Sequence, residues 1–104
     1  MDSLFKKIPS ELPEELSDTI LNTDHVRVER IVSKGHASPD SFWYDQDRNE
    51  LVVLVQGSAG LRFENKEEVV ILKTGDYMVI DAHVKHRVEW TDPSCETIWL
   101  AVHY

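Results

Sequence analysis

Apolar and polar residues alternate in short runs from His25 onward, which is the two-residue period of a β-strand. Polar segments around Gly57 and Gly75 separate some of these runs and indicate turns. A spacing of about 8–12 residues between turn signals is typical of an antiparallel β-sandwich or barrel. We therefore predict an all-β domain over residues 25–104, with strands at 25–32, 42–45, 50–56, 61–64, 69–72, 77–80, 86–90 and 97–103.

The N-terminal segment, residues 1–24, follows a different pattern. Leu12, Leu16, Ile20 and Leu21 fall at helical spacing and would form one apolar stripe. The segment is too short to bury a core of its own. We expect an N-terminal arm with a short helix that lays this stripe on the body of the domain.

The composition narrows the classes of partner. The 104 residues are enough for one small domain with a single core. Nineteen acidic against eleven basic residues give a net charge of −8, which disfavours binding to nucleic acid and to anionic membranes. No apolar run approaches the roughly 20 residues needed to span a bilayer. The single cysteine, Cys95, cannot form an internal disulfide, which favours a cytoplasmic location.

Two segments resemble the sequence motifs of the cupin family. The run from Glu50 to Gly57 matches the second half of the first motif, and Gly35 stands near its expected start. Residues 75–90 keep the spacing of the second motif, with Gly75 and His86 retained and with the Pro, second Gly and Asn replaced. The resemblance covers about residues 25–104. It implies a jelly-roll barrel, or double-stranded β-helix, of the small single-domain RmlC-like type.

The first motif is degenerate where the family has a His-x-His pair. In cupins these two histidines, a Glu and the second-motif His hold a divalent metal. Here the pair falls at Trp43 and Asp45 or at Tyr44 and Gln46, depending on the spacing to the conserved Glu, and neither register contains a histidine.

The resemblance therefore carries only Glu50 and His86 over as metal ligands. A site for Zn, Fe, Mn, Ni or Co needs at least one ligand more, since two alone bind weakly. The candidates are Asp45, preferred as a carboxylate, Gln46, and His36 from a loop that can fold over the barrel mouth.

Strand parity suggests which side chains point into the barrel. His86, Val88 and Trp90 share one face, and Glu50 shares a face with Val52. A buried carboxylate is costly unless it is paired or binds a cation, so Glu50 is either a metal ligand or half of a structural pair with His86. We expect a pocket that includes Tyr44, Phe63, Val88 and Trp90, with His83 at its mouth.

Three functions remain open at this stage. The first is a metal-dependent cupin enzyme of the oxygenase, isomerase or lyase type, and the sequence does not choose among these reactions. The second is a metal-free module that binds a small molecule without catalysis. The third is a scaffold whose barrel is filled by side chains. Leu51, Val53 and Val55 would face outward as an apolar row, from which we expect a homodimer.

Overall fold

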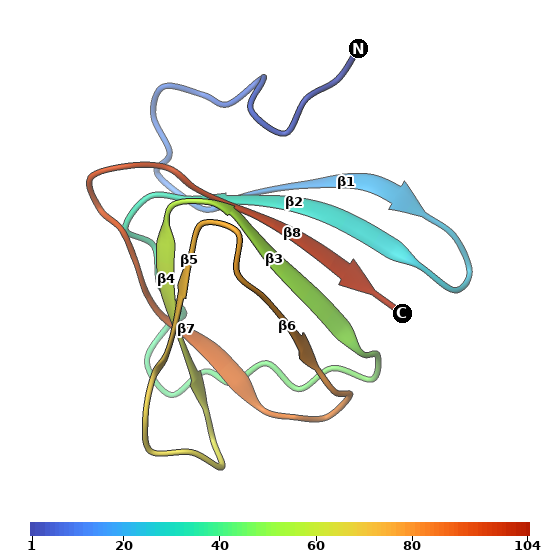
Figure 1. The fold of residues 1–104 in the computed structure, drawn as a ribbon, viewed down its shortest axis with the longest axis vertical. Coiled ribbons are helices and arrows are strands. Elements are labelled where there is room, and N and C mark those ends of the chain that lie inside the picture. Colours follow the sequence, from blue (N-terminus) through green and yellow to red (C-terminus); the bar gives the residue numbers. More distant parts are fainter.

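The computed structural model describes residues 1–104 and contains eight β-strands and no helix (Figure 1). Five strands form one antiparallel sheet in the order β1-β2-β8-β3-β6, and three form a second in the order β5-β4-β7. The all-β fold is therefore confirmed. The strands are β1 (Leu16–Asn22), β2 (Arg27–Ser33), β3 (Glu50–Gln56), β4 (Ser58–Phe63), β5 (Val70–Lys73), β6 (Tyr77–Ile80), β7 (His86–Thr91) and β8 (Thr97–His103).

The N-terminal helix that the apolar spacing suggested does not form. Leu16–Asn22 is instead the edge strand β1, paired antiparallel with β2. Ile20 lies at an irregularity in this pairing and is 54% exposed, so the stripe is not laid on the body as a unit. The free edge of β2 explains the outcome, because its backbone groups need partners and the β-branched Thr19 and Ile20 favour a strand.

Arg30 anchors the first residues of the arm to the outer face of the larger sheet. Its guanidinium is paired with Asp18 and donates hydrogen bonds to the carbonyl oxygens of Leu4 at 3.2 Å and Lys6 at 2.6 Å. Arg30 is only 7% exposed, and a buried charge without such partners would cost several kcal/mol. The arm consequently passes over β1 and β2 (Figure 1).

The core lies between the inner faces of the two sheets. Its nine buried apolar residues come from five strands: Val52, Leu54, Ala59, Leu61, Phe63, Leu72, Ile80, Trp99 and Ala101. Along β3 the buried residues Glu50, Val52 and Leu54 alternate with partly buried neighbours, as the parity of this strand predicted.

Two local predictions were wrong. Residues 42–45 form no strand, and only Tyr44 makes an isolated bridge, to His86. Trp90 does not point into the barrel, because the pairing of β7 with β4 shifts between Gly60 and Leu61. The extra residue of this bulge reverses the side-chain alternation, so Trp90 lies over Gly60, where an added Cβ would collide with the indole.

Candidate functional site

A cavity of about 350 Å³ lies between the sheets, which is within the usual range for small-molecule sites. Its floor and walls come from the inward positions of the larger sheet, from Leu61, His86 and Val88 of the smaller sheet, and from the Tyr44–Gln46 segment. Half of the lining residues are hydrophobic, including Ile31 and Trp99. The barrel is therefore hollow, which disfavours a scaffold filled by side chains.

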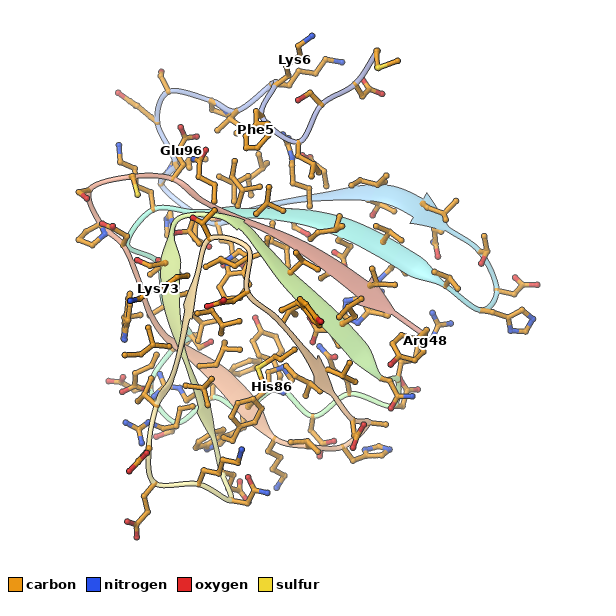
Figure 2. The ribbon with its side chains drawn as sticks, in the orientation of Figure 1. Phe5, Lys6, Arg48, Lys73, His86 and Glu96 are labelled. Carbon is orange, nitrogen blue, oxygen red and sulfur yellow. The ribbon has the colours of Figure 1, made fainter.

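Glu50 and His86 meet inside this cavity from opposite sheets. Glu50 opens β3 and His86 opens β7, and His86 Nε2 lies 3.5 Å from Glu50 Oε1. Their side chains are only 9% and 7% exposed, respectively. Figure 2 shows His86 in the space between the two sheets. The sequence-based expectation that these two residues lie together thus agrees with the geometry.

The hydrogen bonds of His86 define its protonation options. Its Nδ1 lies 2.9 Å from the carbonyl oxygen of Val84, so Nδ1 carries a hydrogen and donates it there. Nε2 then holds a lone pair in the neutral ring and a hydrogen in the imidazolium. Burial lowers the pKa of His86, but Glu50 and the Val84 carbonyl outweigh burial and raise the pKa above its ordinary value.

The carboxylate of Glu50 has an unused acceptor. Its Oε1 is fully buried and has no hydrogen-bond partner, since 3.5 Å to His86 Nε2 is longer than a good hydrogen bond. Buried carboxylate oxygens without partners are rare in folded proteins. This atom is therefore placed to accept a hydrogen from a bound molecule or to contact a cation.

A second polar cluster lines the same cavity at the β1–β2–β8 side. Glu29 Oε1 lies 3.2 Å from His103 Nε2 and 3.0 Å from Arg27 Nε, and Ser17 Oγ donates to Glu29 Oε2 at 2.9 Å. In the sheet, His103 is directly opposite Arg27 on one side and Glu50 on the other. The two polar groups of the cavity are thus adjacent across β8 and β3.

The sequence interpretation missed this cluster. Along β2, Arg27, Glu29 and Ile31 point inward, and the sequence analysis had assigned no inward face to this strand. Parity did contain one signal, since His103 shares a strand face with the core residues Trp99 and Ala101.

The metal ligands expected beyond Glu50 and His86 do not all assemble. Tyr44 and Gln46 line the cavity, so of the two possible registers this pair is the one that faces inward. Asp45 lies outside, with its Oδ1 2.8 Å from His83 Nδ1, and both side chains border a neighbouring polar hollow that shares Gln46 and His103 with the cavity. His36 lies in a loop beside β7, where its Nδ1 accepts a hydrogen bond from the Lys34 backbone.

Of the residues expected in the pocket, Tyr44 and Val88 line the cavity, whereas Phe63, Trp90 and His83 do not. The Tyr44 ring stacks on His86 with 5.5 Å between ring centroids. Phe63 is buried in the core beside His86, and Trp90 is turned away by the bulge. Burial, with the charges of Glu15 and Glu50, raises the pKa of Tyr44, so its hydroxyl keeps its proton.

The side chains present do not match the family's metal-binding set. No group of three or more His, Cys, Asp or Glu residues is arranged to hold a metal ion. Beside the Glu50–His86 pair the cavity offers only the neutral Gln46 amide and Tyr44 phenol, because Glu29 and His103 are paired with each other. Such a set does not fit a tightly held resident metal.

Comparisons with known proteins agree with this fold. The family model of the cupin domain matches residues 29–103. A solved structure from Ralstonia eutropha JMP134, described as a "putative mannose-6-phosphate isomerase", is 41% identical, with 99% of this chain and 95% of that chain covered and a TM-score of 0.95. No curated protein matches the sequence.

More distant solved structures share the fold alone. A cupin superfamily protein from Desulfitobacterium hafniense DCB-2 is 18% identical, with 92% of this chain and 82% of that chain covered and a TM-score of 0.75. An RmlC-like cupin with a double-stranded β-helix fold from Methanocaldococcus jannaschii is also 18% identical, with coverages of 93% and 85% and a TM-score of 0.72. The family-model match over residues 29–103 and the 41% identity to the Ralstonia protein show that the chain belongs to the cupin family.

Proposed function

We propose that this cupin binds a small, uncharged polar molecule in its barrel without a resident metal. The observation that carries the proposal is the buried Glu50 Oε1, which lines the cavity and has no hydrogen-bond partner. A ligand hydroxyl or amide would satisfy this oxygen and remove the cost of leaving it unpaired. His86, stacked against Tyr44, would act as the neighbouring donor or acceptor.

The charges in the cavity favour an uncharged ligand over an anion. Three carboxylates line it, Glu15, Glu29 and Glu50, against a single arginine, Arg27, which already lies beside Glu29. A phosphate group would meet more repulsion than attraction here. The name of the Ralstonia protein refers to a phosphorylated sugar, and for this chain we expect the unphosphorylated form of such a compound to bind better.

A divalent metal bound by Glu50 and His86 is the second candidate. This candidate is supported by the hydrogen bond from His86 Nδ1 to the Val84 carbonyl. In the neutral ring that bond leaves the lone pair of Nε2 facing Glu50 Oε1. With Gln46 and solvent completing the coordination, such an ion would bind weakly. The same metal would open the isomerase, oxygenase and lyase reactions of the family.

Metal analysis and native mass spectrometry of untagged protein separate the two candidates. We expect less than 0.1 metal per chain (roughly the background of such preparations), the same in Glu50→Gln as in the wild type, and a retained organic ligand or a mass shift with added D-mannose. Asp45→Asn is the matched control, since it removes a neighbouring carboxylate outside the cavity. One metal per chain, lost in Glu50→Gln and kept in Asp45→Asn, would overturn the metal-free proposal.

We also propose that the chain forms a homodimer in the cytoplasm. The outer face of the larger sheet carries Leu51, Val53 and Val55, all only partly buried. On β6 of the same sheet, Tyr77 is 72% exposed and Val79 51% exposed. A second copy covering this apolar face would remove it from water.

A further inference from the structure

The cavity contains free hydrogen-bonding groups at both of its polar ends. At one end, Glu50 Oε1 is an unpartnered acceptor that is buried beside His86. At the other end, Glu29 holds Arg27 through its Nε, which leaves the two terminal nitrogens of the guanidinium without a protein partner. Gln46 also lines the cavity and brings both a donor and an acceptor on one amide.

This mixture of donors and acceptors suits hydroxyl groups. A hydroxyl both donates and accepts, whereas a carboxylate or phosphate only accepts and an ammonium only donates. Trp99 and Ile31 supply apolar surface within the same cavity, where the C–H face of a ring can lie. A sugar-like ring, with hydroxyls along its edge and C–H groups on its face, meets both conditions.

The two ends are held at a fixed separation by the sheet. Arg27, His103 and Glu50 are direct neighbours across β2, β8 and β3. Directly opposite residues have Cβ atoms about 4.5–5.5 Å apart, so the Cβ atoms of Arg27 and Glu50 are separated by about 10 Å. We expect a single ligand that contacts both Arg27 and Glu50 to carry several polar groups.

We infer that Arg27, Glu29 and His103 form a second hydroxyl-binding subsite opposite the Glu50–His86 pair, and that the ligand is an uncharged polyhydroxy ring. This inference rests on the proposed function and adds the class of ligand and the residues that select it. Glu29 orients the subsite by fixing Arg27 and His103, while Ser17 holds the far oxygen of Glu29. Selectivity comes from the second subsite, because a molecule with one hydroxyl engages only one end.

The test is a titration of ¹⁵N-labelled full-length protein with three probes: myo-inositol, D-mannose and cyclohexanol. We expect myo-inositol or D-mannose to shift the backbone amides of residues 27–29 and 101–103 together with those of Glu50 and His86. Cyclohexanol, a ring of the same size with one hydroxyl, should bind at least about tenfold more weakly. Glu29→Gln should weaken polyol binding by about tenfold, since it releases Arg27 and His103.

Controls separate this inference from the proposed function. Glu89→Gln removes a carboxylate that is also paired with arginines, but on the outer side of β7, and should leave binding unchanged. His103→Gln provides a second variant if Glu29→Gln does not fold. Polyol shifts confined to Glu50 and His86, or equal affinity for cyclohexanol and myo-inositol, would overturn the second subsite and leave the proposed function standing. An absence of shifts with every probe would count against both.

Discussion

Gly57 forms the corner where the chain leaves β3 for β4, and replacing it by alanine should be severely destabilising. Its φ of +96° lies in the left-handed region, where a Cβ costs about 1–2 kcal/mol. A Cβ at this position would also lie 2.8 Å from the Cα of Thr97, which opens β8. Thr97 is fully buried and its hydroxyl donates to the Ser58 carbonyl at 3.3 Å, so it has little room to move.

Gly75 provides a matched comparison. Its φ of +91° is nearly the same, but nothing lies within 4 Å of an added Cβ. Gly75→Ala should therefore cost only the backbone strain of about 1–2 kcal/mol. Gly57→Ala should cost about 1–3 kcal/mol more, the usual cost of forcing extra volume into a packed site.

Urea unfolding followed by tryptophan fluorescence, with thermal melting as a second probe, measures the difference between the two variants. A gap of 1 kcal/mol corresponds to about 4–8 °C in Tm for a domain of this size. Equal losses in the two variants would refute the steric argument and leave strain as the only cost. Gly57→Ala should also shift the amides of Trp99 and His103, because Thr97 begins the strand that lines the cavity.

Three further predictions concern the site, the turn at His83 and the outer face of the larger sheet. The pKa of His86, measured by NMR, should lie above about 6.5 in the wild type and fall below it in Glu50→Gln, where burial is opposed only by the Val84 carbonyl. Because folding raises this pKa, the His86–Glu50 contribution to stability should be full below about pH 6.5 and lost as the pH rises through the pKa of the folded state. A difference in the free energy of unfolding between the wild type and Glu50→Gln that grows with pH would contradict this. His83 has a φ of +64°, so His83→Gly should be about 1 kcal/mol more stable than His83→Ala in urea unfolding, whereas the reverse order would exclude backbone strain there. Light scattering at tens of micromolar (roughly the range in which obligate dimers persist) should give a dimer that Val53→Arg converts to monomer, and a monomeric wild type would refute the dimer.

The strand pattern was predictable because it depends on local alternation. Glu50, Val52 and Leu54 were expected to point inward and do so, since β3 is regular at these positions. The prediction that Trp90 points inward failed because β7 is irregular next to this residue. One extra residue in β7 inverts the alternation, and no local sequence signal marks that bulge.

The site was predictable only where a motif spans both of its halves. Glu50 and His86 were found because the family spacing connects two distant segments. Glu29 and His103 were missed because their proximity depends on β2 lying beside β8, a pairing between the start and the end of the barrel. The prediction of an N-terminal helix failed because pairing with the free edge of β2 outweighs the helical spacing of the apolar residues. That edge exists only in the folded sheet, so the local sequence does not reveal it.

The way in which Arg30 anchors the arm determines which mutations the arm can tolerate. The guanidinium binds main-chain carbonyl oxygens of Leu4 and Lys6, which every amino acid possesses. Side-chain replacements at these positions should therefore be nearly silent, whereas removing the segment would leave Arg30 with Asp18 alone. The arm should therefore tolerate amino-acid substitutions but not changes in its length. Insertions and deletions are the changes that would release it from Arg30.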